Sequence, residues 1–275
     1  MKTCVEMRLA VGFLVAPVWW WLGATGLGLL QGLVGGAFGI GGSSIGTPLL
    51  RLLLGTPPLV ALGTPLPLTV PTAAAGTVIY HRHGMVNWRA VRWTVPLATP
   101  AAAAGAVCTR WAPVDLVMLL VATAMLLSAA QLWRSAAALT CSAVRGGGTW
   151  HGAPVWLLVA MGAGVGFVSG LLANAGGFLL VPLYVWMLGA RVRQAAATSL
   201  ACAPFIALPG LVVHGMLGHI DPILALQMGI GSVVGSLLGA RLSLRFERWR
   251  LRQPFAVLLL AFGLYFAVRV AGRGA

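Results

Sequence analysis

A glycine-rich apolar stretch occurs twice in this chain of 275 residues, from residue 26 to 50 and again from residue 162 to 184. At a constant offset of 134 residues, 18 of the 79 positions from 28 to 106 are identical to those from 162 to 240. Half of these matches are Gly or Pro, the residues that most constrain backbone conformation. The sequence therefore predicts an internal duplication with equivalent structures in its two halves.

The composition indicates a membrane protein. Hydrophobic residues make up 59% of the chain, charged residues 8%, and the mean hydropathy is +0.94. A soluble domain carries about a quarter charged residues. Apolar runs of about 20 residues recur along the chain, enough for a helix to cross a hydrocarbon core of about 30 Å. We therefore predict an all-α polytopic membrane protein.

The net charge of +14 does not indicate a nucleic-acid-binding protein, because the basic residues lie in loops between apolar runs. Twelve of the 18 basic residues lie in alternate loops, at residues 81–92, 134–151, 189–193 and 241–252. Basic loops stay in the cytoplasm during membrane insertion. The expected location is the cell (inner) membrane, with the lipid bilayer as a partner and no nucleic acid.

The duplication sets the expected domain boundaries. Residues 1–17 form an N-terminal extension, 18–133 the first transmembrane repeat, 134–151 the inter-repeat loop and 152–275 the second repeat. Each repeat reads as five apolar segments, which gives about eight full spans, or ten segments with the short ones. An odd number of segments gives the halves opposite orientations, the inverted-repeat plan of secondary transporters. The predicted segments are 18–38, 45–54, 59–80, 88–107, 113–133, 154–172, 178–188, 194–213, 222–240 and 255–268.

A helix in each half is broken, at residues 39–44 and 173–177. A new short helix follows each break, and its first N–H groups lack intrahelical acceptors. Each helix N-terminus also carries about half a positive charge. Two such ends meeting near mid-membrane would bind an anion. The predicted substrate-binding residues are Gly41, Gly42, Ser43, Ser44, Thr64, Asn174, Gly176, Gly177, Thr198 and Ser199.

Several of these residues also have a purely structural interpretation. Ser43 or Ser44 would cap the first short helix, and Asn174 would shape the second break. Thr64 and Thr198 would either line the site or bond to backbone. Glycines every fourth residue would permit close helix packing. The predicted structural motif comprises Gly32, Gly36, Gly39, Pro48, Gly166, Gly170 and Pro182, with both prolines in or near the first turn of a short helix.

The ionisable residues exclude other classes of site. All four carboxylates lie at predicted ends or loops, so none lies in a span to bind a cation. No cluster of His, Asp, Glu and Cys suggests an enzyme, a metal site or a cofactor. The cysteines are expected to be buried apolar residues, although Cys202 could face the substrate path. The histidines His81, His83, His214 and His219 are expected at span ends, as loop residues rather than proton carriers.

These motifs resemble the sulfite exporter TauE/SafE family of membrane permeases. The resemblance lies in GxxxGxxGIGG at residues 32–42 with Pro48, in Gly63-Thr64, and in the equivalent motifs from Gly166 to Ser199. It implies an inner-membrane carrier for small sulfur anions such as sulfite, sulfoacetate or thiosulfate, usually an exporter. The chain departs from the family pattern at Ser43-Ser44 and at residues 173–175, where Ala-Asn-Ala replaces Gly-x-Gly.

The leading hypothesis is therefore a secondary transporter that exports a small sulfur-containing anion by alternating access. An importer of thiosulfate or another small anion is the alternative within transport. A membrane-embedded enzyme and an assembly subunit are more distant alternatives. The sequence leaves open which anion is carried, the direction, a coupling ion such as H+ or Na+, and a homo-oligomeric state.

Overall fold

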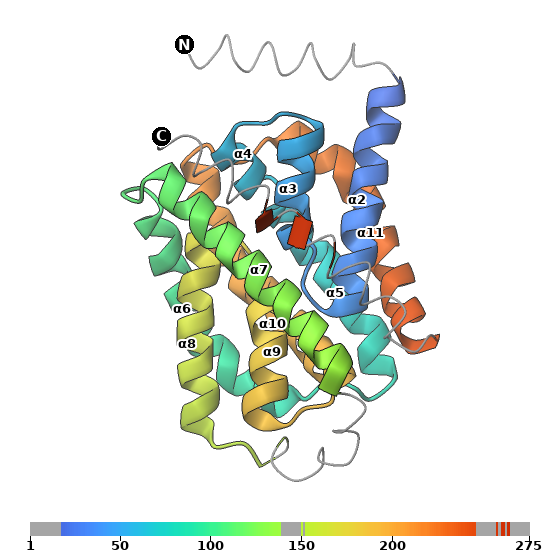
Figure 1. Cartoon of the computed structure of the whole chain (residues 1–275), viewed down its shortest axis with the longest axis vertical. Coiled ribbons are helices and arrows are strands. Elements are labelled where there is room, and N and C mark those ends of the chain that lie inside the picture. The colour runs from blue at the N-terminus through green and yellow to red at the C-terminus, as the bar shows by residue number, and fades with distance from the viewer. Residues whose placement is uncertain are drawn as a thin grey trace.

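A computed structural model describes residues 18–138, 150, 152–245, 257, 260, 261, 263 and 264. Within these residues the secondary structure is entirely helical (Figure 1). The predicted N-terminal extension and most of the inter-repeat loop and of the last predicted segment lie outside the described residues. The helices are α2 (Val18–Phe38), α3 (Ser43–Leu53), α4 (Pro58–Gly63), α5 (Leu66–Arg82), α6 (Trp88–Cys108), α7 (Val114–Ala138), α8 (Val155–Leu171), α9 (Gly177–Leu188), α10 (Val192–Met216) and α11 (Pro222–Arg245).

The predicted all-α membrane architecture is confirmed at the level of helix content and apolarity. Among the described residues, four helical stretches are long and apolar enough to cross a membrane. They are Trp21–Phe38, Pro58–Arg82, Val192–Met216 and Pro222–Arg245. The apolar helices Val155–Leu171 and Gly177–Leu188 are shorter. The count of about eight full spans thus remains a prediction.

Several predicted boundaries need correction. The first short helix begins at Ser43, two residues before the predicted start, because Gly42 already serves as its N-cap. The predicted segment 59–80 is two helices, since α4 ends at Gly63 and α5 begins at Leu66 after Pro65. Pro48 and Pro182 lie in the second turns of α3 and α9 rather than in the first. A proline there removes one intrahelical hydrogen bond in each short helix.

Two long helix pairs have equivalent contacts in the two halves. A Cβ atom on Gly28, Gly32 or Gly36 of α2 would collide with main-chain oxygens of α11. A Cβ atom on Gly162, Gly166 or Gly170 of α8 would collide with main-chain oxygens of α6 in the same way. The absence of a side chain therefore lets each pair of backbones touch. The oxygens belong to Met228, Ser232 and Ser236, and to Thr94, Ala98 and Ala102, which are equivalent residues at the 134-residue offset.

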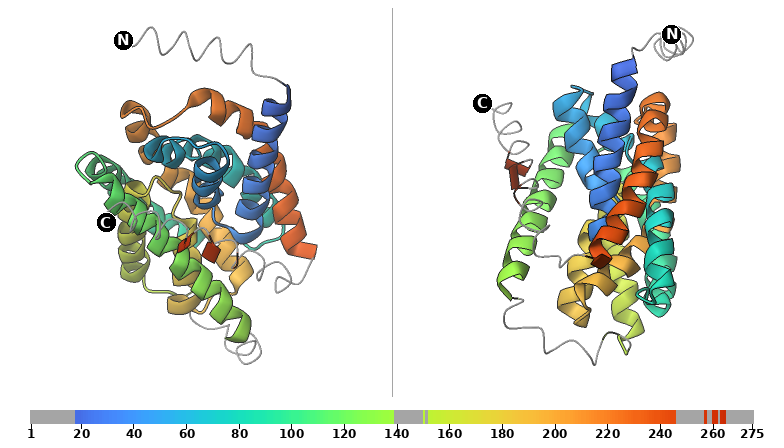
Figure 2. Two further views of the ribbon diagram at one scale, coloured as in Figure 1. Left: turned by 45° about the horizontal axis from the view of Figure 1, so that its top comes forward. Right: turned by 90° about the vertical axis from the view of Figure 1, so that its right-hand side faces the viewer.

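Helices α5 and α10 pack against each other between these pairs, with the short helices α3 and α9 beside them (Figures 1 and 2). Tyr80 of α5 donates its hydroxyl proton to the main-chain oxygen of Gly36 at 3.0 Å. His214, the equivalent residue of α10, has Nε2 at 3.0 Å from the main-chain oxygen of Gly170. His214 lies in the last turn of α10, at a span end as expected, but it is a completely buried helical residue rather than a loop residue.

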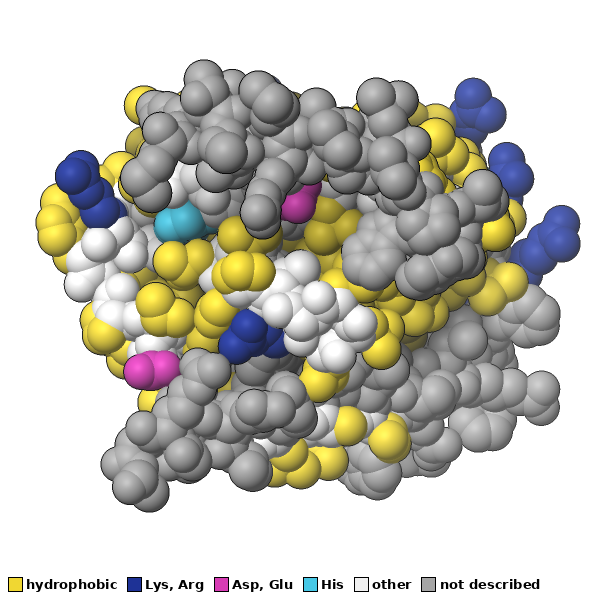
Figure 3. Space-filling model, turned by 90° about the horizontal axis from the view of Figure 1, so that it is seen from above, with side chains coloured by type: hydrophobic (Ala, Val, Ile, Leu, Met, Phe, Trp, Pro, Cys, Tyr) yellow, Lys and Arg dark blue, Asp and Glu magenta, His cyan; other side chains and the backbone are white. Residues whose placement is uncertain are grey.

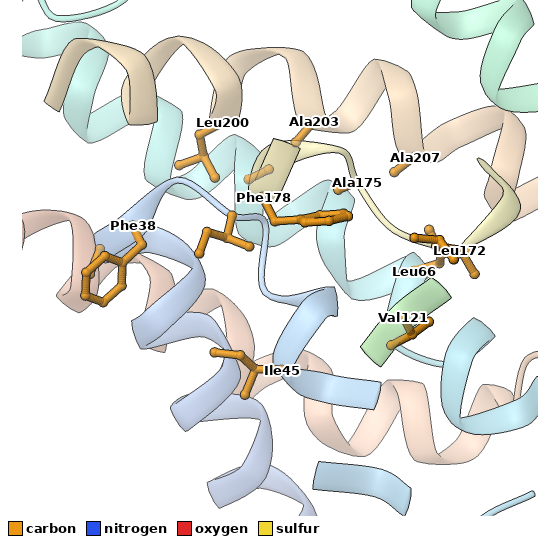
Figure 4. Close-up of a cluster of buried hydrophobic side chains, with 14 of the residues drawn as sticks. Phe38, Ile45, Leu66, Val121, Leu172, Ala175, Phe178, Leu200, Ala203 and Ala207 are labelled. Atoms are coloured by element: carbon orange, nitrogen blue, oxygen red, sulfur yellow. The ribbon is translucent and has the colours of Figure 1, made fainter. Parts of the chain in front are cut away.

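The hydrophobic core surrounds the two helix breaks. Phe178, at the start of α9, lies beside Ala175 in the second break and faces Leu200 and Ala203 of α10 (Figure 4). Ile45, at the start of α3, belongs to the same buried cluster. Helix α2 descends in Figure 1 from the end where α4 lies, whereas α8 rises toward that end. The breaks that follow these helices consequently meet inside the molecule.

Candidate functional site

The two helix breaks are in direct contact. Ser43 donates its hydroxyl proton to Oδ1 of Asn174 at 2.5 Å. The N–H group of Ala175 donates to the same Oδ1 at 2.7 Å and lies 3.4 Å from Oγ of Ser43. A Cβ atom on Gly41 would lie 3.0 Å from Cβ of Ala175. The first residues of α3 and the residues just before α9 are therefore adjacent and buried.

Both short helices begin after a glycine with a positive φ angle. Gly42 has φ +85° and Gly176 has φ +75°, a region that L side chains rarely adopt. Neither helix has a side-chain cap, so the expected cap by Ser43 is wrong: Ser43 is the first helical residue, and its hydroxyl bonds to Asn174 instead. The unpaired N–H groups and positive dipole ends of both helices are thus concentrated in one buried region.

The structure brings most of the predicted site residues to this region. Ser199 of α10 donates its hydroxyl proton to the main-chain oxygen of Gly39 at 2.6 Å. Gly39 itself packs against Ala196, since a Cβ atom there would lie 2.5 Å from the Ala196 Cα. Gly177 packs on the residues Gly39 and Ile40 of the opposite break. Ser44 lies in the first turn of α3, and its side chain is outside the described part of the structure.

Thr64 and Thr198 make equivalent contacts in the two halves. The hydroxyl of Thr64 accepts the N–H of Asp221 at 3.1 Å, just before α11. The hydroxyl of Thr198 accepts the N–H of Asn87 at 3.0 Å, just before α6. Both threonines are completely buried. Each hydroxyl therefore bonds to main chain at the start of a neighbouring helix, which is the structural role expected as the alternative for these two residues.

Two side chains that the sequence analysis did not select lie against the start of a short helix. Gln31 of α2 and Ser169 of α8 are completely buried, and their side-chain polar atoms find no partner among the described residues. A Cβ atom on Gly42 would lie 3.4 Å from Nε2 of Gln31, and one on Gly176 would lie 2.7 Å from Oγ of Ser169. Buried polar groups are almost always paired. Polar residues inside apolar helices are the signal that could have identified them.

The position of Ala173 gives a test of the second break. Ala173 has φ +45°, whereas Gly39, its equivalent in the first half, has φ +75°. A left-handed conformation costs an L residue about 1–2 kcal/mol. We expect Ala173→Gly to raise the free energy of unfolding by about 1 kcal/mol, measured by thermal unfolding in detergent. Ala175→Gly is the matched control and should not stabilise; equal stabilisation by both would contradict this interpretation.

The thiol of Cys202 contacts a tyrosine of α9. Cys202 is completely buried in α10, where its Sγ lies 3.8 Å from the hydroxyl of Tyr184. The same Tyr184 hydroxyl lies 3.0 Å from Oγ1 of Thr94. Among the described residues, no three His, Cys, Asp or Glu side chains are arranged to hold a metal ion.

Comparison with known proteins agrees with this architecture. The model of one protein family, described as "Sulfite exporter TauE/SafE", matches residues 24–266. The chain belongs to the sulfite exporter TauE/SafE family. Together with its apolar helices, this membership makes it a multi-pass membrane protein of a transporter family.

Curated proteins that resemble this TauE/SafE protein are named as probable membrane transporters. The chain is 25% identical over 255 residues to the probable membrane transporter protein YjnA of Bacillus subtilis (strain 168), covering 86% of this chain and 96% of the relative. It is 30% identical over 230 residues to the probable membrane transporter protein y4hK of Sinorhizobium fredii, covering 77% and 84%. No solved structure matches the chain.

Proposed function

We propose that this TauE/SafE protein exports a small sulfur-containing anion, such as sulfite or an organosulfonate, across the cell (inner) membrane. The anion binds where α3 and α9 begin, between the two helix breaks. The observation that supports this site is the pair Gln31 and Ser169, each buried, unpartnered among the described residues and next to the glycine N-cap of a short helix. The names of the curated relatives support transport across a membrane, and the family description supports a sulfur anion as the substrate.

The chemistry of the breaks favours a negatively charged ligand. Two helix N-termini contribute about half a positive charge each, together with unpaired N–H groups. The amide of Gln31 and the hydroxyl of Ser169 can add two further donors. Of the described carboxylates, Asp115 lies in the first turn of α7 and Asp221 accepts the N–H groups of Ile223 and Leu224. Neither places a competing negative charge at the breaks.

The equivalent contacts of the two halves support an inverted repeat and alternating access. Each long glycine-containing helix packs on a helix from the other half, α2 on α11 and α8 on α6. These two pairs flank α5 and α10, which contact the breaks. Rocking of the α2–α11 pair against the α6–α8 pair would expose the anion first to one side of the membrane and then to the opposite side. The basic loops would face the cytoplasm.

Import of thiosulfate or another small anion is the alternative, and it uses the same site. Cys202 is the residue at which this alternative would be tested, and its thiol lies 3.8 Å from the hydroxyl of Tyr184. Export is the direction that we propose, on the strength of the family description.

Flux measurements on purified protein in liposomes test this proposal. Sulfite, sulfoacetate, thiosulfate and sulfate are added in turn, with current and labelled-anion flux as readouts. We expect saturable flux of one sulfur anion and its loss in Gly176→Leu, because a side chain there would press against Ser169 and the start of α9. Gly164→Leu is the matched control, since nothing lies within 4 Å of a Cβ atom at Gly164. Unchanged flux in correctly folded Gly176→Leu would refute the site, and no flux of any of the four anions would refute the substrate class.

A further inference from the structure

Two histidines at the end of α10 form a hydrogen-bonded pair that the anion site does not use. Nδ1 of His214 lies 3.0 Å from Nδ1 of His219, and Nε2 of His214 lies 3.0 Å from the main-chain oxygen of Gly170. His214 is completely buried, whereas His219 is partly exposed in the turn before α11. The surface at this end of the molecule shows a histidine among hydrophobic side chains (Figure 3).

These contacts determine where the neutral pair carries its protons. The carbonyl oxygen of Gly170 can only accept, so Nε2 of His214 must carry a proton. In a neutral imidazole the other nitrogen is then bare, so Nδ1 of His214 accepts and Nδ1 of His219 donates. Nε2 of His219 is left with a free lone pair. A further proton therefore binds first at this nitrogen, on the partly exposed ring.

We propose that the pair His214–His219 is a proton-binding site that couples anion movement to the movement of a proton. This inference rests on the proposed transport function. One proton binds Nε2 of His219, and the proton shared by the two Nδ1 atoms can then pass to His214, which becomes the imidazolium. The pair binds one proton rather than two, because two imidazoliums would direct N–H groups at each other across 3.0 Å.

The location of the pair connects the proton to the anion site. Gly170 lies at the end of α8, and its main-chain oxygen also accepts the N–H of Ala173, the residue that begins the second break. The C-terminus of a helix carries about half a negative charge, which offsets part of the cost of a buried imidazolium at His214. A proton on His214 thus places a positive charge beside the main-chain oxygen of Gly170. Gly170 lies three residues before Ala173, where the second break begins. An ionisable side chain buried in a membrane helix is energetically costly, and such residues usually have a function.

The surroundings of the pair contain few other charges. The helices α2, α4, α8 and α9, which pack on α10, contain no His, Asp, Glu, Lys or Arg. The turn between α5 and α6 binds the start of α10 through Asn87 and Thr198. His214 lies 16 residues farther along α10, or about 24 Å along the helix axis. Residues at the α5–α6 end are therefore remote from the pair: His81, Arg82, His83, Arg89 and Arg92.

Charged residues at the same end as the pair include Arg51 in the last turn of α3, Arg110, Asp115 in the first turn of α7, and Asp221 before α11. Asp221 directs its carboxylate to the first N–H groups of α11. Arg110 is exposed and follows Thr109, whose hydroxyl donates to the main-chain oxygen of Leu171. The titratable group whose charge acts on His214 is His219. Burial, rather than neighbouring charges, is therefore the main influence on protonation of the pair.

The state of the pair at neutral pH gives the expected direction of its pH dependence. Burial lowers the pKa of His219 below its ordinary value of 6.5. The ring is therefore neutral at pH 7 and gains its proton only as the pH falls through this lowered pKa. The loaded state is favoured on the acidic side of the membrane and lost on the neutral side. A proton gradient across the membrane would thus favour binding of the proton by the pair from the acidic side and its release to the neutral side.

Proton movement in proteoliposomes that contain the full chain and an internal pH dye tests the coupling. Thiosulfate and sulfoacetate are the probes, because neither binds a proton near neutral pH, unlike sulfite. In the wild type we expect anion flux to change the internal pH, and an imposed pH gradient to drive uptake. His214→Gln and His219→Gln should keep downhill labelled-anion flux and lose both effects. His81→Gln, an exposed histidine that contacts Trp88, is the matched control and should keep them.

The outcomes separate this inference from the proposed function. Anion flux without any pH change in the wild type, or coupling retained in both histidine variants, would overturn the proton site alone. Absence of anion flux would refute the proposed function. In that case ¹⁵N-histidine NMR titration in detergent still tests the pair. We expect one shared titration step for His214 and His219 that is lost in His219→Gln, and independent titration of the two rings would overturn the inference.

Discussion

Gly32→Ala should prevent α2 and α11 from packing as they do in the native protein. The added methyl group would overlap the main-chain oxygen of Ser232, and that oxygen cannot move without shifting the whole of α11. Overpacking normally costs about 1–3 kcal/mol, and a clash between two backbones lies at the upper end, at about 3 kcal/mol. Gly166→Ala should cost a similar amount, because its methyl group would overlap the main-chain oxygen of Ala98.

Thermal unfolding in detergent, followed by size-exclusion chromatography, measures this effect. Gly26→Ala is the matched control, because nothing lies within 4 Å of a Cβ atom at Gly26 in the same helix. Alanine should stabilise that position by up to about 1 kcal/mol through helix propensity. If Gly32→Ala unfolded at the same temperature as Gly26→Ala, the close approach of α2 and α11 would be wrong.

The glycines were predictable because they act through the backbone. A four-residue spacing in an apolar helix indicates close packing on its own, and the duplication repeats the signal in Gly32 and Gly166. The breaks were predictable for the same reason, since Gly42 and Gly176 adopt positive φ angles that suit glycine. The sequence did not show which helices these glycines contact, because the partners come from the opposite half of the chain.

The polar contacts could not be predicted from the sequence. Thr64 and Thr198 looked like site residues because they are equivalent, but their hydroxyls bond to N–H groups before α11 and α6. The pairing of His214 with His219 depends on where α10 ends and how the next turn folds. Ser43 resembled a helix cap, yet Asn174 of the other half accepts its proton. The contacts of Thr64, Thr198 and Ser43 join residues more than 100 positions apart, and such contacts leave no local pattern.

Gln31→Leu and Ser169→Ala should change stability and transport in opposite directions. In the native protein without anion, both side chains are buried and have no partner among the described residues. An unpaired buried polar group costs about 1–3 kcal/mol, so its replacement by an apolar group of similar size should stabilise the fold. The same change removes a hydrogen bond to the anion, worth about 1.5–3 kcal/mol, and should lower apparent affinity roughly 10- to 100-fold.

Thr72→Val provides the matched control for this pair of variants. Thr72 is equally buried, but its hydroxyl donates to Oγ of Ser232 at 3.1 Å. Its loss should lower stability by about 1 kcal/mol and leave anion affinity unchanged. Added anion should raise the unfolding temperature of the wild type and of Thr72→Val. It should raise the unfolding temperature of Gln31→Leu much less, because a ligand stabilises only a folded state that binds it. If the Gln31→Leu variant lost stability but kept full anion affinity, the amide of Gln31 would have a structural role. The anion would then have to bind elsewhere.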